Sequence, residues 1–187
     1  MRNAVAFDID PVLWLPLPRR STLTDDRRVR WLDAAVTRAA RNAAANQADL
    51  PEIERRCVAV LDGADEGEQC ILFPLGEAEP TVARIASAPA DAQWFARVDE
   101  ATEGLGEGAR VAREPRDHAA FEEAARIMRL ERPARGEVRV RVLFAGHCDG
   151  IGVTLEGASR SLSAAGQLAR AGAVVFDSFS LRGDAVG

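Results

Sequence analysis

The stretch 137–144 constrains the fold of this chain more than any other, because apolar and charged side chains alternate along it. One face of an extended strand there would carry Val138, Val140, Val142 and Phe144, and the other Glu137, Arg139 and Arg141. A period of two with β-branched residues is typical of a half-buried β-strand. We expect this strand to lie inside a sheet, with its valine face against the core.

Composition fits a single globular domain over residues 1–187, whose last residues, about 183–187, we expect to form a short flexible tail. Of the 187 residues, 47% are hydrophobic and 28% are charged, and the formal net charge is −5. A negative chain has no overall field that attracts nucleic acid, so we expect no nucleic-acid partner. Because Asp8 and Asp10 interrupt the first apolar run, and no run reaches 18 apolar residues, we expect neither a signal peptide nor insertion into a membrane.

Residue usage also excludes several reaction types. All 24 basic residues are arginine and tyrosine is absent, which rules out a P-loop lysine and a Schiff base. Histidine chemistry has two candidates, His118 and His147. The three cysteines, Cys57, Cys70 and Cys148, form no CxxC motif, and an odd number cannot all be paired. We therefore expect free thiols and a cytoplasmic location.

The order of predicted elements indicates an α+β fold with a largely antiparallel, twisted sheet packed by helices. Strands are expected at 4–9, 56–61, 69–75, 81–86, 109–113, 137–144, 151–156 and 173–181, and helices at 25–46, 89–101 and 163–172. The segment 118–131 fits a helix by composition, yet 127–131 fits a strand equally well. In the predicted 56–61/69–75 hairpin, Cys57 and Cys70 would be neighbours, either as buried hydrophobes or as a redox pair.

The helix 25–46 carries the candidate binding site. Its predicted apolar stripe comprises Val29, Leu32, Val36, Ala39, Ala40 and Ala43. Trp31 falls outside that stripe, among arginines, and Trp and Arg are enriched at interface hot spots. We therefore predict a partner-binding face made of Trp31, Arg27, Arg38, Arg30 and Trp14. The alternative is that the proline segment around Trp14 folds over Trp31 and the arginine stems stack on its ring.

Two local patterns suggest ligands, and neither has a supporting context. His147, Cys148 and Asp149 are adjacent, and adjacent residues cannot generally all reach one metal ion, so we predict no metal site. The glycine-rich stretch 104–108 lacks both a preceding strand and a following helix, so we predict no nucleotide cofactor.

The N-terminal stretch 4–13 resembles the first motif of haloacid-dehalogenase-type phosphatases, in which two aspartates one residue apart end an apolar strand. The resemblance implies that Asp8 attacks phosphorus, that Asp10 is the acid/base and that a magnesium ion is bound. Pro11 departs from the motif, and only Asp177 or Asp184 is available for the later acidic metal ligands.

The order of elements resembles the Mog1/PsbP-like α/β sandwich of small bacterial proteins. The resemblance rests on the segment 14–18 followed by a helix with Trp31, on the strand pair at 137–156, and on the closing helix and 174–179. It implies a non-catalytic binder or assembly factor. We expect a protein-interaction module without cofactors, a subunit of a larger bacterial complex, with protein partners or further copies of itself. The alternatives are the magnesium-dependent phosphatase and a small-molecule binder.

Overall fold

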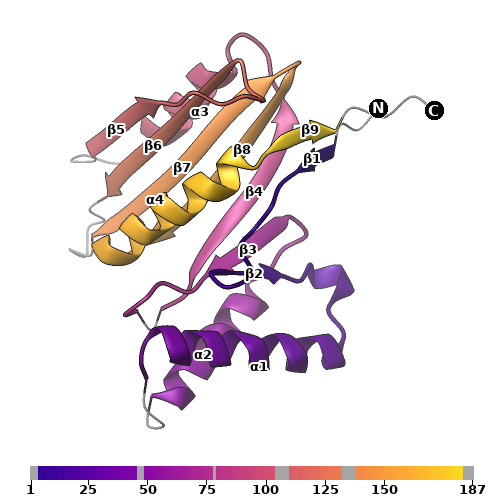
Figure 1. Cartoon of the computed structure of the whole chain (residues 1–187), viewed down its shortest axis with the longest axis vertical. Coiled ribbons are helices and arrows are strands. Elements are labelled where there is room, and N and C mark those ends of the chain that lie inside the picture. The colour runs from indigo at the N-terminus through magenta and orange to yellow at the C-terminus, as the bar shows by residue number, and fades with distance from the viewer. Residues whose placement is uncertain (1–3, 46–48, 78, 104–109, 132–137, 183–187) are drawn as a thin grey trace. The chain divides into compact units, whose positions relative to one another are not determined.

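The computed structural model describes residues 4–45, 49–77, 79–103, 110–131 and 138–182 (Figure 1). The predicted tail at 183–187 and the glycine-rich stretch 104–108 lie outside these residues. The chain forms two compact units, one of residues 11–84 and the other of residues 1–10 and 85–187. The single domain over 1–187 stays a prediction, and the two units are described separately.

The unit 11–84 combines two helices with the strand order β2-β3-β4. Its elements are β2 (Trp14–Leu17), the 3-10 helix η1 (Arg20–Thr22), α1 (Asp25–Asn42), α2 (Leu50–Asp62), β3 (Glu68–Leu72) and the first residues of β4 (Thr81–Pro89). Strands β2 and β3 pair antiparallel. Thr24 caps α1, because its side chain accepts a hydrogen bond from the Arg27 amide. Buried side chains of both helices and of β3 form the core.

The second unit has the strand order β4-β8-β7-β6-β5 and a separate two-stranded pair, β1 with β9. Its elements are β1 (Ala4–Ala6), α3 (Trp94–Glu103), β5 (Arg110–Pro115), β6 (Glu123–Glu131), β7 (Arg139–Cys148), β8 (Ile151–Ser159), α4 (Leu162–Asp177) and β9 (Ser180–Arg182). The pairs β5–β6, β6–β7, β7–β8 and β1–β9 are all antiparallel. The predicted α+β class with a mainly antiparallel sheet is therefore confirmed.

Strand β7 is the central strand that the valine pattern predicts. It lies between β6 and β8, and Val140, Val142 and Phe144 are buried on one face. Helix α4 packs on β7 and β8 (Figure 1), where the Phe144 and Phe176 rings stack with centroids 5.5 Å apart. For the segment 118–131, the sequence left helix and strand as alternatives. It contains strand β6, so the strand is the one observed.

The predicted strand at 56–61 is wrong, because these residues belong to helix α2. The buried side chains of α2 are Ile53, Cys57 and Leu61, a spacing of four that places them on one helical stripe. Pro51 lies in the first turn, where a missing N–H costs no hydrogen bond. The alternation of side chains over 56–61 fits a strand when it is taken alone, and the helical period becomes visible only over the longer range of α2.

The predicted closing strand at 173–181 is also wrong, because α4 continues to Asp177 and only Ser180–Arg182 form strand β9. The β-branched pair at 174 and 175 suggested a strand. Val175 and Phe176 are both buried, whereas Val174 is exposed, a pattern of a helix and not of a strand.

Trp94 packs directly on the backbone of Gly152, and this contact gives a testable prediction. A Cβ atom on Gly152 would lie 2.2–2.5 Å from three indole atoms of Trp94. We expect Gly152→Ala to lower the free energy of unfolding by about 1–3 kcal/mol, because the indole must move. The matched control is Gly166→Ala in α4, whose Cβ would meet nothing nearer than an Arg170 nitrogen at 3.7 Å.

We expect Gly166→Ala to be stabilising by about 0.5–1 kcal/mol, since alanine favours helix. Urea unfolding of both variants measures the difference. Equal stability of the two variants would contradict the packing of Trp94 on Gly152.

Candidate functional site

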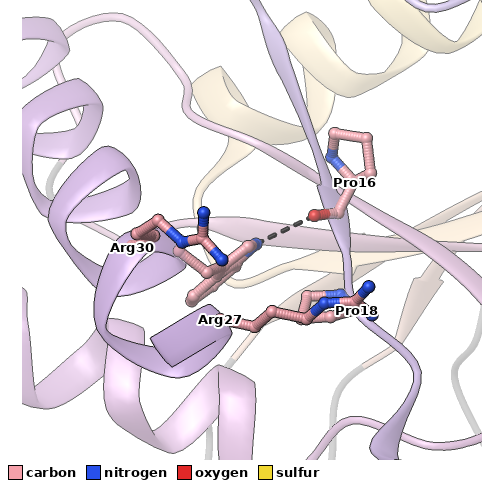
Figure 2. A pocket seen from close by; sticks show the side chains of 5 residues that line it. Pro16, Pro18, Arg27 and Arg30 are labelled. Carbon is pink, nitrogen blue, oxygen red and sulfur yellow. Dashed lines mark hydrogen bonds between the residues drawn. The ribbon is translucent and has the colours of Figure 1, made fainter. Parts of the chain in front are cut away.

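The outer edge of strand β2 is covered by side chains of helix α1. The Phe73 amide donates to the Leu13 carbonyl. The backbone N–H and C=O groups of odd-numbered β2 residues therefore point toward β3, and those of even-numbered residues point away from it. The Trp31 indole N–H donates to the Pro16 carbonyl at 2.8 Å (Figure 2), and an Arg38 N–H donates to the Trp14 carbonyl at 2.8 Å. Pro16 itself has no N–H to present at this edge. Helix α1 thus satisfies the carbonyls that an incoming strand would need.

The predicted position of Trp31 outside the buried stripe is wrong. Trp31 is 8% exposed and forms the buried stripe with Ala35 and Ala39, while Val29 is 66% exposed. In a helix this rich in alanine, counting apolar positions does not fix the buried face, and the largest ring gains most from burial. The first part of the alternative, in which the proline segment covers Trp31, is confirmed by the hydrogen bond to the Pro16 carbonyl, whereas stacking of the arginine stems on the ring stays a prediction. Trp14 is 1% exposed, so its ring is no part of the surface.

An open pocket of about 270 Å³ remains beside this contact (Figure 2). We call it the Trp31 groove, and it is lined by Pro16, Pro18, Arg27, Arg30 and Trp31. Arg27 donates one N–H to the Thr22 carbonyl at 3.1 Å, and Arg30 donates one to the Asp26 carbonyl at 3.3 Å. Each guanidinium has five N–H donors, so both arginines keep donors for a ligand.

The Trp31 groove brings together three of the five predicted site residues: Trp31, Arg27 and Arg30. Arg38 is half-buried and is held by the Trp14 carbonyl, so it has a structural role. The sequence-based site missed Pro16 and Pro18, although their spacing in an extended segment was visible. Proline and indole surfaces beside two guanidinium groups suit an extended segment that carries carboxylates, because arginine binds carboxylates with paired hydrogen bonds.

Asp8 and Asp10 do not have the setting that the phosphatase motif implies. Strand β1 ends at Ala6, two residues before Asp8, and pairs with β9 alone in its sheet. Both aspartates are exposed, and the Asp8 amide donates to the Ser178 hydroxyl at 2.8 Å. The apolar strand that should end in these carboxylates is therefore shorter than the resemblance requires.

A second group of polar side chains gathers at the β7–β8 turn. Glu122 lies beside Cys148 and Asp149, with ligand atoms of the three within 4.8 Å of one another. The sequence did not predict that Glu122 would join this turn; its amide donates to the His147 carbonyl at 2.9 Å. Burial and the neighbouring Asp149 and Glu122 carboxylates raise the pKa of the Cys148 thiol. A raised pKa disfavours the thiolate, which is the form that binds metal ions.

The predicted neighbourhood of Cys57 and Cys70 depended on a hairpin that does not form. Both thiols are free and buried. Burial raises the pKa of Cys57 to about 11 and that of Cys70 to about 12. Since the thiolate is the reactive form, both residues act as small buried hydrophobes, which is the first of the two alternatives.

Comparison with known proteins supports the fold and goes no further. No protein-family model matches the chain, and no curated protein matches it in sequence. Among the described residues, no helix has both the length and the apolar character needed to cross a membrane. The solved structure of LpqN, described as involved in cell envelope biogenesis of Mycobacterium tuberculosis, is 11% identical with a TM-score of 0.54. The match covers 97% of this chain and 86% of LpqN, and at this identity it shows that the two share a fold.

Proposed function

We propose that this protein is a non-catalytic protein-interaction module that binds its partner in the Trp31 groove. The observation that carries the proposal is the juxtaposition of two proline rings and an indole with Arg27 and Arg30. Trp31 is already fixed by its hydrogen bond to the Pro16 carbonyl. A preformed surface loses little conformational entropy when a partner binds, which favours affinity.

The proposed partner is a protein with an extended segment that carries carboxylate side chains. Its apolar atoms would cover Pro16, Pro18 and the indole edge, while its carboxylates would accept hydrogen bonds from Arg27 and Arg30. Hydrogen bonds to charged groups contribute about 1.5–3 kcal/mol each. Two such contacts are enough to select an acidic segment over a neutral one.

The cellular setting is also part of the proposal. We place the protein in the bacterial cytoplasm, as a subunit of a larger complex, because its odd number of cysteines suits a reducing compartment. The resemblance to the Mog1/PsbP-like group, whose members are mostly binders and assembly factors, stays a prediction, and the closing strand on which it partly rests is replaced by the end of helix α4 at residues 174–177.

Charge reversal in the Trp31 groove should abolish partner binding. We expect the amount of partner that co-purifies with the double variant Arg27→Glu, Arg30→Glu to be about a tenth of the wild-type amount or less, because like charges repel the acidic segment. The measurement is co-purification from the native host with quantitative mass spectrometry.

The matched control is Arg41→Glu, Arg170→Glu, which changes the net charge equally at two exposed helical positions outside the Trp31 groove. A protein retained by the wild type and by this control, and lost by the groove variant, is the expected result. Equal retention by all three would refute the assignment of the groove, and circular dichroism must show that all three are folded.

A further inference from the structure

Strand β5 forms an open edge of the sheet in the second unit. It is the last strand in the order, its six residues are all exposed, and it pairs with β6 on one side (Figure 1). The Arg116 amide donates to the Ala124 carbonyl, so backbone groups of even-numbered residues face β6. The backbone groups of Val111, Arg113 and Pro115 therefore point away from β6, toward the open edge.

The two outer strands differ in how their edges are covered. Side chains of α1 bind the outward carbonyls of β2. Within the described residues, no strand pairs with the outer side of β5, while α3 contacts the Arg113 side chain through Asp99 and Phe95, and α4 lies over β7 and β8 (Figure 1). Pro115 has no N–H, so only the residues before it can both donate and accept backbone hydrogen bonds at this edge. An unpaired edge of this kind is a template for a further strand.

We propose that β5 pairs antiparallel with β5 of a second copy of this chain, about a two-fold axis at Ala112. In this register the outward groups of Val111 exchange two hydrogen bonds with those of Arg113 of the second copy. The symmetry repeats this pair, which gives four backbone hydrogen bonds. Both sheets would then continue across the interface, as in other cases of strand addition.

Charge complementarity selects this register. Arg110 lies opposite Glu114 of the second copy, on one face, and the pair occurs twice by symmetry. Opposite charges directly across two strands are stabilising, and like charges are destabilising. A register centred on Arg113 instead would place Arg113 opposite itself and would bring Val111 opposite Pro115, which cannot donate. Glu114 also contacts Arg126 within its own chain, and a carboxylate has acceptor sites for both partners.

Two single charge reversals and their mixture test the proposed dimer. Arg110→Glu and Glu114→Arg each place like charges opposite one another twice, so each alone should weaken self-association by about tenfold. A one-to-one mixture of the two variants should associate as well as the wild type, because the introduced glutamate then faces the introduced arginine, and the remaining pair is native. Sedimentation equilibrium from about 10 μM to about 1 mM covers the range of a small, transient interface.

A wild type that stays monomeric through this range would overturn the proposal. So would single variants with unchanged association, or a mixture in which association is not restored. Because Glu114→Arg also removes the contact with Arg126, Val111→Pro provides an independent variant. It removes an outward N–H at an exposed position and leaves the ladder with β6 intact, and it too should lose association.

Discussion

Replacing Trp31 with alanine is expected to lower the free energy of unfolding by about 3–5 kcal/mol. The indole is buried in the core of its unit, and its N–H satisfies the Pro16 carbonyl at the edge of β2. The variant removes the ring, opens a cavity and leaves that carbonyl without its donor. Urea unfolding followed by far-UV circular dichroism measures the loss without relying on tryptophan fluorescence.

Val29→Ala is the matched control for Trp31→Ala, because both residues lie on α1. Val29 is exposed, so its truncation should change the free energy of unfolding by less than about 0.5 kcal/mol. The apolar stripe predicted from the sequence implies the reverse order, with Val29 buried and Trp31 outside. A larger loss for Val29→Ala than for Trp31→Ala would show that α1 presents the other face to its core.

Phe176→Ala should have an effect of similar size, a loss of about 3–5 kcal/mol. Phe176 is fully buried in α4, and its ring lies 5.3–5.5 Å, between centroids, from four other rings: His118, Phe121, Phe144 and Phe179. Its removal takes the common member out of this aromatic cluster. The measurement is again urea unfolding, with near-UV circular dichroism as a report on ring packing.

Val174→Ala is the control for Phe176→Ala. In the strand predicted for 173–181, Val174 and Phe176 would share a face, and both truncations would be costly. In helix α4, Val174 is exposed and alanine has the higher helix propensity, so the change should be neutral or slightly stabilising. Comparable losses at both positions would argue for the strand.

Sequence alone predicted the parts of the fold in which the pattern of apolar residues fits only one period, either that of a strand or that of a helix. The valine alternation in β7 has no helical reading, because charged residues occupy every other position. In α2 and at the end of α4, short runs of β-branched residues fit both periods. Burial of Ile53, Cys57 and Leu61, and of Val175 with Phe176, decided for the helix. Intrinsic strand propensity was overridden there by tertiary packing.

The candidate site was predictable in its components and not in its arrangement. The arginines and the proline segment were visible in the sequence, and the structure places three of the five predicted residues in the Trp31 groove. Trp14 and Trp31 turned out to be buried, because an α1 rich in alanine left the orientation of the helix to its largest side chain. The proximity of Glu122 to Cys148 depends on the β6–β7 register, which no local pattern specifies.

Site-specific photo-crosslinking in the native host tests the proposed binding role most directly. A photoreactive phenylalanine analogue at Pro18 lies in the Trp31 groove, and the same analogue at Val174 lies on an exposed face of α4. The account predicts a crosslinked protein adduct from position 18 that disappears when Arg27→Glu and Arg30→Glu are added, and no such adduct from position 174. No adduct at position 18, or one that survives both charge reversals, would contradict it.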